Sequence, residues 1–549
     1  MKKIAFLFLT IVFLTNCSPK KQTINTETPF VWEGANLYFL LIDRFNNGNP
    51  ANDKIIVRDK ETGVLRNFMG GDIKGITQKI DEGYFTDLGI NAIWMTPVVE
   101  QIHDAVDEGT GNTYGFHGYW TKDWTAIDPS FGTREDLKEL VEKAHAKGIR
   151  IVLDAVINHT GPVTELDPVW PESWVRTGPK CTYDSYENYI DCTLVENLPD
   201  IKTESNEAVE LPPALVEKWK KEGRYEEEIA ELDAFFKQTG YPRAPKYYIM
   251  KWLADYITDF GIDGYRVDTV KHTNEAVWAD FSKVCQETFV QFKKDNPTKV
   301  LDDNSFFMVG EVYGYGINGK QWYDFGDKKV NYFENGFNSL INFDFKGDAH
   351  KSYEELFSNY SKTLQNDLKG LSVMNYVSSH DDGWPFDKKR ERSLEAGTKL
   401  LLTPGIAQVY YGDETARPLD IKGTEGDATL RSFMNWDDVK SNENTKNVLS
   451  HFQKLGNFRS NHPAIGAGIH KEISKAPFYT FSRTFTKGDY TDHVIVGLDL
   501  PIGKKTINVN AVFEDGEALI DAYSGENVTV KDGEVIIDSP FGFVLLERK

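Results

Sequence analysis

Short apolar runs with the composition of strands alternate with helical patterns from residue 32 to about residue 450, and this alternation most constrains the fold. Strands that alternate with helices pair in parallel, because each helix carries the chain back to the same end of the sheet. We therefore predict an α/β domain of βα units around a parallel sheet. The predicted strands cover residues 37–42, 91–95, 150–156, 264–267, 306–310, 372–377 and 406–411.

One predicted helix, residues 133–147, carries signals at both ends. Thr133 is its N-cap, Asp136 occupies the capping-box position, and Gly148 follows the last turn. Side chains that satisfy the first backbone N–H groups, and a glycine beyond the last turn, are the usual boundaries of a helix.

The spacing breaks once, because about a hundred residues separate the strands at 150–156 and 264–267. A loop of this length predicts an inserted subdomain, which we place at about residues 160–246. It contains a charged helical stretch, residues 213–237, whose charges we expect to form a solvated face.

The pattern changes again from residue 467, where short strands such as 493–500 and 535–538 follow one another. Asp532-Gly533 between two such runs is a hairpin signal. Residues 467–549 therefore read as a separate all-β domain, and residues 32–466 as the domain of βα units.

The amino terminus reads as a targeting segment. Two lysines precede an apolar run, residues 4–14, that is too short to anchor the chain in a bilayer. Residues 1–17 are predicted to be the signal peptide, and the polar, proline-containing residues 18–31 a flexible tether.

The signal segment ends at Leu14-Thr15-Asn16-Cys17, which resembles the lipobox of bacterial lipoproteins. That resemblance implies lipidation of Cys17 and attachment to the outer membrane. We favour the periplasmic face, because residues 18–21 lack the acidic run associated with surface export in some Gram-negative groups. The alternative is an ordinary secretory signal with an incidental cysteine.

The net charge of the chain narrows the classes of partner. The formal net charge of −22 argues against nucleic acid as a partner, because that partner requires a basic surface.

Cys181 and Cys192 are close in sequence, and an exported chain sits where disulfides persist, so we predict a bridge between them. Cys285, in a helical pattern, is expected to be a buried free thiol.

Three carboxylates stand at or just beyond the ends of predicted strands. Asp268 comes two residues after Arg266, Glu311 follows an apolar strand, and Asp381 follows His380. Two carboxylates facing one bond are the minimum equipment for cleaving an acetal. Arg266 is expected to depress the pKa of Asp268, whereas desolvation and nearby acids are expected to raise that of Glu311.

These segments together resemble the α-amylase family, glycoside hydrolase family 13. The matching motifs are residues 154–159, 198–201, 264–272, Glu311, 380–381, 89–97 and 405–414. The resemblance implies a (β/α)8 TIM barrel with an inserted domain B and a C-terminal β-sandwich domain C. It implies that Asp268 is the nucleophile, Glu311 the acid/base and Asp381 the transition-state stabiliser of a reaction that retains anomeric configuration.

The resemblance also implies the sugar site, with the Tyr119 ring stacked on the sugar at the cleavage point. The residues carried over as substrate-binding are His117, Tyr119, His159, Arg266, Lys271, His272, His380, Asp427 and Arg431. Lys271 and His272 would lie on the leaving-group side, and Asp427 and Arg431 on the glycone side.

Two calcium sites follow from the same resemblance, and oxygen ligands of these types suit calcium. The first, at the junction of domain B and the barrel, would use Asn158, Asp200, the His272 carbonyl and Asp191. The second resembles the N-terminal loop of cyclodextrin glucanotransferases and would use Asn47, Asn49, Asn52, Asp53, Gly70 and Asp72. The alternative for the second is an Asn/Gly/Pro turn without a metal.

The nearest resemblance within the family is to periplasmic α-amylases of Gram-negative bacteria. It implies hydrolysis of α-1,4-glucan by a protein that we expect to be monomeric and to contact the membrane only through its anchor. A neopullulanase-like or debranching enzyme, or a cyclomaltodextrinase, is the alternative within the enzymes. An inert glycan-binding relative is a remote alternative, because such relatives typically lose one of the three acids.

Overall fold

The computed structural model describes residues 28–549. The predicted signal peptide, Cys17 and most of the tether therefore lie outside the described residues. Within them, no helix has the length and apolar composition needed to cross a membrane.

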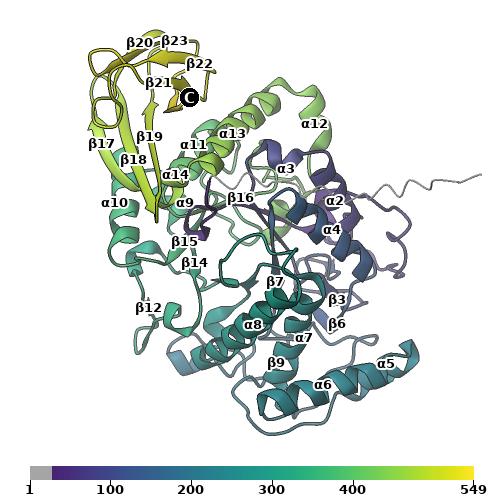
Figure 1. The fold of residues 1–549 in the computed structure, drawn as a ribbon. Coiled ribbons are helices and arrows are strands. Elements are labelled where there is room, and N and C mark those ends of the chain that lie inside the picture. The colour runs from purple at the N-terminus through teal and green to yellow at the C-terminus, as the bar shows by residue number, and fades with distance from the viewer. Residues whose placement is uncertain (1–27) are drawn as a thin grey trace, which may run out of the picture.

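Eight parallel strands close into a barrel in the order β1-β16-β15-β14-β11-β10-β7-β2. They are β1 (Asn36–Leu40), β2 (Ala92–Met95), β7 (Arg150–Ala155), β10 (Gly264–Val267), β11 (Phe307–Gly310), β14 (Ser339–Asn342), β15 (Ser372–Tyr376) and β16 (Ile406–Tyr410). All are buried. Helices cover the outside of the barrel (Figure 1), and buried side chains form its core. The predicted (β/α)8 barrel is confirmed (Figure 1).

Seven of these strands fall on the predicted runs, but β14 was not predicted. Its sequence, Ser339-Leu340-Ile341-Asn342, is short and half polar, so it lacks an apolar signal. Inside the barrel wall, Asn342 Nδ2 donates to Tyr360 Oη at 2.9 Å and to Asn375 Oδ1 at 2.8 Å, whereas the Ser339 hydroxyl is buried without a partner.

The helices of the barrel follow the local signals. They include α2 (Ile73–Asp81), α4 (Arg134–Ala146), α7 (Pro245–Phe260), α8 (Glu275–Asp295), α10 (Tyr353–Gln365), α11 (Ser393–Leu402) and α13 (Glu443–Asn461). The predicted cap of α4 is confirmed, since Thr133 and Asp136 form a reciprocal capping box. Gly148 has a φ of 73°, which favours glycine.

The long insertion lies between β7 and α7 and carries little regular structure before its two helices. The stretch predicted as one charged helix is two, α5 (Pro213–Glu222) and α6 (Tyr225–Thr239), because Gly223 adopts a left-handed φ of 77° and ends the first. The charges are not all solvated: Lys218 of α5 lies 2.5 Å from the buried carboxylate of Asp123.

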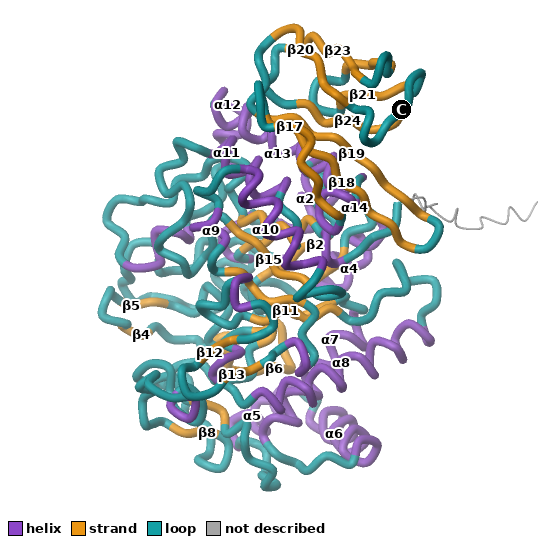
Figure 2. Tube along the Cα trace, turned by 90° about the vertical axis from the view of Figure 1, so that its left-hand side faces the viewer, coloured by secondary structure: helices purple, strands orange, loops and turns teal. Residues whose placement is uncertain are grey.

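The C-terminal domain is a β sandwich that packs on the barrel at the end opposite α5 and α6 (Figures 1 and 2). Its strands are β17 (Ile469–Ser474), β18 (Tyr479–Lys487), β19 (Tyr490–Leu498), β20 (Gly503–Asn508), β21 (Ala518–Asp521), β22 (Glu526–Thr529), β23 (Glu534–Ser539) and β24 (Val544–Arg548). Six of them form one sheet, and β20 pairs with β23 to form the second layer. A separate apolar core fills the space between the layers.

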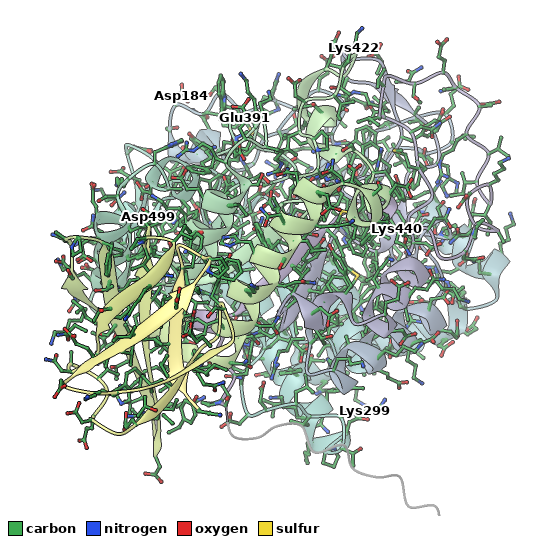
Figure 3. The ribbon with its side chains drawn as sticks, turned by 90° about the horizontal axis from the view of Figure 1, so that it is seen from above. Asp184, Lys299, Glu391, Lys422, Lys440 and Asp499 are labelled. Carbon is green, nitrogen blue, oxygen red and sulfur yellow. A yellow bond between two sulfur atoms is a disulfide. The ribbon has the colours of Figure 1, made fainter. Side chains whose placement is uncertain are left out.

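The predicted hairpin turn precedes β23. Asp532 and Gly533 both have positive φ, 55° and 73°, as the turn of a tight hairpin requires. A view from above shows this domain beside the barrel, and charged side chains such as Lys299 and Lys422 at the periphery (Figure 3).

The register of three barrel strands determines the site. Arg266 of β10 lies opposite Asp154 of β7 and Val309 of β11. Val267 in turn lies opposite Gly310, so Asp268 and Glu311 leave their strands at the same level.

Candidate active site

Backbone hydrogen bonds extend the barrel ladder as far as the two acids. The Asp268 N–H donates to the Ala155 carbonyl at 3.0 Å, and the Glu311 N–H donates to the Val267 carbonyl at 2.9 Å. Both acids therefore stand on the rigid rim at the carboxyl ends of the strands, where TIM-barrel enzymes hold their reacting groups.

One buried guanidinium gathers three carboxylates, and we call this group the Arg266 centre: Arg266, Asp154, Asp268 and Glu311. Arg266 Nη1 lies 3.0 Å from both oxygens of Asp154 and 2.8 Å from Asp268 Oδ1. Arg266 Nη2 lies 3.1 Å from Glu311 Oε2. Three acids facing one arginine leave the centre with surplus negative charge.

Burial raises the pKa of the two acids that face the cleft, Glu311 and Asp268. It raises the pKa of Glu311 to about 7, and the charges of Asp268 and Asp381 act in the same direction, as expected from the sequence. The expectation for Asp268 is wrong: its pKa is raised to about 6, because burial and the neighbouring carboxylates outweigh the attraction of Arg266. Of the two, Asp268 has the lower pKa and ionises more readily, whereas Glu311 keeps its proton to a higher pH.

The residue after Asp268 holds an unfavourable backbone conformation. Thr269 has a φ of 49°, which is costly for a β-branched side chain, about 1–3 kcal/mol. This conformation lets the Thr269 N–H donate to Glu311 Oε2 at 3.0 Å. The strained turn thus links the two acids.

Asp381 reaches the same cleft from the loop that follows β15. Its carboxylate binds Arg431, and its Oδ2 lies 2.8 Å from His380 Nε2. Burial acts to raise the pKa of Asp381, but His380 and Arg431 outweigh it and hold the pKa well below its usual range. Arg431 also lies 2.5 Å from Asp427, so the two predicted glycone-side residues are paired.

Tyr119 forms an aromatic face beside these acids. Its hydroxyl donates to Asp154 Oδ2 at 2.9 Å, and its ring stacks against His380 at 5.4 Å and His117 at 5.9 Å. His159 Nε2 lies 3.2 Å from the Tyr119 carbonyl. Burial lowers the pKa of His159 to about 4 and that of His117 well below its usual value, so both are neutral imidazoles at pH 7.

A cleft of about 300 Å³ brings most of the predicted residues together. Its wall contains His117, Tyr119, His159, Asp268, His272, Glu311, Asp381, Asp427 and Arg431. Arg266 and His380 are absent from the wall and contact the wall residues from behind. The wall also contains residues that were not predicted: Glu108, Trp120, Val195, Leu198, Thr269 and Tyr313.

Lys271 also lies off the wall. Its Nζ donates to the Tyr313 carbonyl at 2.9 Å, and burial lowers its pKa to about 8. His272 does line the cleft, with Nδ1 at 3.1 Å from the Tyr189 carbonyl. Lys271 is therefore placed to fix Tyr313 rather than to form the wall itself.

A larger cleft, about 520 Å³, lies between the barrel and β18. It is lined by residues that precede β15 and β16, such as Leu371 and Pro404, so it opens at the amino ends of the strands. Glu33 is its one carboxylate, and the carboxylate pair that acetal cleavage requires is missing there. The smaller cleft at the carboxyl ends is therefore the candidate active site.

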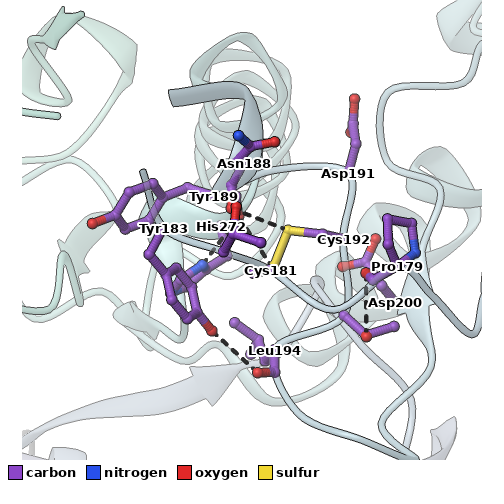
Figure 4. The surroundings of a disulfide bond; sticks show 12 residues. Pro179, Cys181, Tyr183, Asn188, Tyr189, Asp191, Cys192, Leu194, Asp200 and His272 are labelled. Carbon is purple, nitrogen blue, oxygen red and sulfur yellow. Dashed lines mark hydrogen bonds between the residues drawn. A yellow bond between two sulfur atoms is a disulfide. The ribbon is translucent and has the colours of Figure 1, made fainter. Parts of the chain in front are cut away.

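The predicted disulfide is present beside the cleft. The sulfur atoms of Cys181 and Cys192 are bonded, with a Cα–Cα distance of 5.1 Å (Figure 4). Cys285 is a buried free thiol in α8, as predicted. The loop closed by the bridge carries Tyr189, whose ring stacks on His272.

Three predicted calcium ligands come together near this loop. The Ile201 N–H donates to the Asn158 carbonyl at 2.8 Å, and Thr273 Oγ1 donates to Asn158 Oδ1 at 3.0 Å. These contacts place Asp200 and His272 next to Asn158. Burial raises the pKa of Asp200 to about 8. A buried carboxylate with too little positive charge around it fits a cation site.

Asp191 does not join these ligands. Its side chain is 45% exposed, and its carboxylate points away from Asp200 (Figure 4). It lies 3.8 Å from Arg176 Nη2, and Arg176 Nε lies 3.1 Å from Asp200 Oδ2. Arg176 therefore supplies part of the positive charge for both acids.

The N-terminal loop also fits a cation. The side-chain oxygens of Asn47 and Asn52 are buried without partners. Asn47 Nδ2 donates to Asp53 at 3.0 Å, and a Cβ added at Gly70 would lie 2.6 Å from that nitrogen, so only glycine fits. Asp72 differs from the prediction in having a second role, because it accepts from Gly75 N at 2.6 Å as the N-cap of α2.

The alternative for this loop, a turn without a metal, also fits the structure, because the Asn52 N–H donates to the Asn49 carbonyl at 3.1 Å. Across residues 28–549, no cluster of three or more His, Cys, Asp or Glu side chains is placed to hold a metal. A cation at either site would therefore draw on amide and backbone oxygens, as calcium does.

Residues 39–464 match the family described as Alpha amylase, catalytic domain. The chain is 34% identical to the periplasmic α-amylase of Escherichia coli strain K12 over 84% of this chain and 72% of that protein. The chain belongs to the α-amylase family. It is therefore a member of a family of glycoside hydrolases.

Further relatives of this α-amylase family member are more distant. A beta/alpha-amylase of Paenibacillus polymyxa is 27% identical over 94% of this chain but 37% of its own length. Among solved structures, an Anoxybacillus α-amylase has a TM-score of 0.63 at 24% identity and covers 95% of this chain and 99% of its own. The α-amylase of Geobacillus thermoleovorans, solved with acarbose, has a TM-score of 0.64 at 21% identity and covers 95% and 100%.

Two acids of the site, Asp154 and Glu108, received no role from the sequence. Asp154 was quoted within a family motif but given no role, although it joins Tyr119 to Arg266. Its position at a strand end, like that of the other acids, was the available signal. Glu108 lies in a short hairpin of the long connection that follows β2, so nothing in the local sequence marked it.

Proposed function

We propose that the protein is an α-amylase that hydrolyses α-1,4-glucosidic bonds in starch, glycogen and malto-oligosaccharides with retention of configuration. The observation that carries the proposal is the Arg266 centre, which holds Asp268 and Glu311 on one guanidinium at the edge of a cleft shared with Asp381. The family and the periplasmic α-amylase relative support the substrate class.

In the first step, an Asp268 oxygen attacks the anomeric carbon while Glu311 gives its proton to the glycosidic oxygen. The bond from that carbon to the glycosidic oxygen breaks, and the leaving sugar departs with a new hydroxyl. Because its pKa is raised, the Glu311 carboxyl group can hold a proton near neutral pH and donate it. The ionised Asp268 carboxylate supplies the electron pair.

In the second step, the Glu311 carboxylate takes a proton from water, and the water oxygen attacks the same carbon and releases Asp268. Asp381 stays ionised throughout and stabilises positive charge on the ring. Tyr119 stacks on the sugar at the cleavage point, and His117, His159, His272 and His380 contact or orient its hydroxyls.

A product profile on amylose, pullulan and cyclodextrin tests the activity. We expect linear malto-oligosaccharides from amylose and slow turnover of the other two substrates. Panose or maltotriose as the main product of pullulan would instead favour the neopullulanase or debranching alternative, and rapid opening of cyclodextrin would favour a cyclomaltodextrinase. Binding without turnover of any of them would favour an inert relative.

We also propose two calcium ions. Asn158, Asp200 and the His272 carbonyl would hold one, and Asn47, Asn52, Asp53 and Gly70 the other, with Asn49 and Asp72 at its edge. When bound, calcium supplies positive charge that holds neighbouring loops together. Chelation should lower the melting temperature, and re-addition of calcium, but not of magnesium, should restore it.

Finally, we propose export and lipid anchoring through Cys17, with the periplasmic face of the outer membrane favoured. The periplasmic α-amylase relative supports export. Cys17→Ser should move the protein from the membrane fraction to the soluble fraction. Protection from protease in intact cells would support the periplasmic face.

A further inference from the structure

A short hairpin outside the barrel contributes an acid to the cleft. The hairpin consists of β4 (Val106–Asp107) and β5 (Asn112–Thr113), and Glu108 in its turn lies in the cleft wall together with Asp427 and Arg431. The Glu108 side chain is 42% exposed, so its carboxylate is accessible. None of the functions assigned above uses it.

Arg66 holds this hairpin in place. Its Nη1 lies 3.2 Å from Glu108 Oε2 and donates to Thr113 Oγ1 at 3.1 Å. Its Nη2 donates to the Glu425 carbonyl at 3.1 Å and lies 3.4 Å from Asp427 Oδ1. The Arg66 side chain is 6% exposed, so these contacts fix one geometry. Arg66 thereby ties the hairpin to the segment that carries Asp427.

The contacts continue to the reacting centre. Asp427 pairs with Arg431, and Arg431 binds Asp381. Glu108 is thus the outermost member of a chain of alternating charges that begins at Asp381. Burial and the charge of Asp427 raise the pKa of Glu108, which is consistent with two acids that share Arg66 at this end of the cleft.

We propose that Glu108 contacts the substrate and determines specificity: it accepts hydrogen bonds from the hydroxyls of a glucosyl unit at the part of the cleft that Asp427 lines. A carboxylate suits this task because it accepts from vicinal hydroxyls without donating. This inference rests on the proposed function.

The test compares Glu108→Ala and Glu108→Gln with the wild type on maltoheptaose labelled at its reducing end. We expect Glu108→Ala to shift the ratio of cleavage at neighbouring bonds about tenfold, because a hydrogen bond to a charged group is lost. Glu108→Gln keeps one acceptor oxygen and should shift the ratio less. Unchanged bond ratios in both variants would overturn the proposal. If the melting temperature fell at the same time, the role of Glu108 would be limited to holding Arg66 in place.

Asp107→Asn is the matched control. Asp107 lies on the same hairpin and is exposed, and its Oδ1 accepts from the Gly109 N–H at 2.8 Å and the Gly111 N–H at 3.1 Å, contacts that asparagine can keep. This variant removes the same charge from the hairpin and should leave the bond ratios unchanged. An equal shift in Asp107→Asn would show an effect of net charge and would overturn the role of Glu108.

Binding separates this inference from the proposed function. In a Glu311→Gln background, adding Glu108→Ala should weaken maltoheptaose binding about tenfold by calorimetry. Absence of hydrolysis by the wild type would refute the proposed function, whereas the binding comparison would still decide the role of Glu108. Equal affinity in the single and double variants would refute that role.

Discussion

Two buried arginine groups show what distinguishes a reactive centre from a structural one. In the Arg266 centre, three carboxylates surround the guanidinium, and its pKa is raised well above its usual value, because their charges outweigh burial. Arg459 of α13 and Arg483 of β18, which we call the junction arginines, are buried between barrel and sandwich. Burial lowers the pKa of both to about 9.

The junction arginines donate to neutral carbonyls, although Arg459 Nε and Arg483 Nη2 are buried without partners. Arg459 Nη1 donates to the Leu401 carbonyl at 3.0 Å and to the Thr403 carbonyl at 2.9 Å, and Arg483 Nη1 donates to the Leu402 carbonyl at 2.6 Å. Burial of an arginine is therefore not a sign of function by itself. The sign is the surplus of carboxylates and their access to a cleft.

The largest effect should come from the acid of the Arg266 centre. Glu311→Gln should lower kcat about 100- to 10,000-fold, because general acid catalysis is lost, while binding of maltoheptaose remains. Steady-state kinetics and calorimetry measure the two quantities. Glu443→Gln, at an acid that is 87% exposed on α13, is the control and should leave kcat unchanged. Unchanged turnover in Glu311→Gln would refute the assigned role.

The second test compares the arginines directly. Arg266→Met should lower the free energy of unfolding by about 3–5 kcal/mol, because it leaves buried carboxylates without a counter-charge. Arg483→Met should cost about 1–3 kcal/mol, because it leaves neutral acceptors, two carbonyls and a ring nitrogen of His470, unpaired. Denaturant unfolding at pH 7 measures both costs. The distinction between the two groups would be wrong if Arg483→Met lowered the free energy of unfolding more than Arg266→Met does. It would also be wrong if Arg483→Met abolished activity while the protein remained folded.

A third test concerns the junction at high pH. His462 lies 2.8 Å from Asp492, contacts Glu547 with its other ring nitrogen, and has a pKa raised to about 9, because these carboxylates outweigh burial. A pKa raised above the unfolded value means that the charged histidine stabilises the fold fully below pH 6.5. This stability, at most about 3 kcal/mol, should be lost as the pH rises through 9.

Unfolding measurements from pH 6 to pH 10 follow this loss. His462→Gln should remove the pH-dependent part of the free energy of unfolding that arises at the junction. A wild-type curve with the same slope as that of the variant would contradict the prediction.

The smallest effect is the pH dependence of activity. Burial raises the pKa of Asp268 to about 6 and that of Glu311 to about 7, and the charge of Asp268 contributes to the second shift. Activity requires ionised Asp268 and protonated Glu311, so kcat/KM should be highest between about pH 6 and pH 7 and fall about tenfold per unit on either side. A flat profile from pH 5 to pH 9 would show that other groups control the rate.

The part of the fold that the sequence predicted is the part with local signals. Seven barrel strands are apolar runs, and the caps of α4 are short-range contacts. β14 was not predicted because its Ser339 and Asn342 are polar, and the partners of Asn342 are distant in the sequence. The break between α5 and α6 escaped although Gly223 was visible, because a single glycine is tolerated in many helices.

The site residues likewise divide into those that carry a local sequence signal and those that do not. Asp268 and Glu311 were found because strand ends of a barrel converge, but the pKa of Asp268 was misjudged, because the sequence shows Arg266 two residues away and does not show burial. Glu108 was missed because its place in the cleft depends on Arg66, which is far from it in the sequence.

The pairing of β10 with its neighbours has a further consequence. Arg266 lies opposite Asp154 and Val309. Because side chains alternate along a strand, a slip of one residue would turn Arg266 out of the barrel and carry Asp268 with it. Turnover is therefore a direct report on correct strand alignment, and an activity assay during refolding would count only those molecules whose barrel has closed in register.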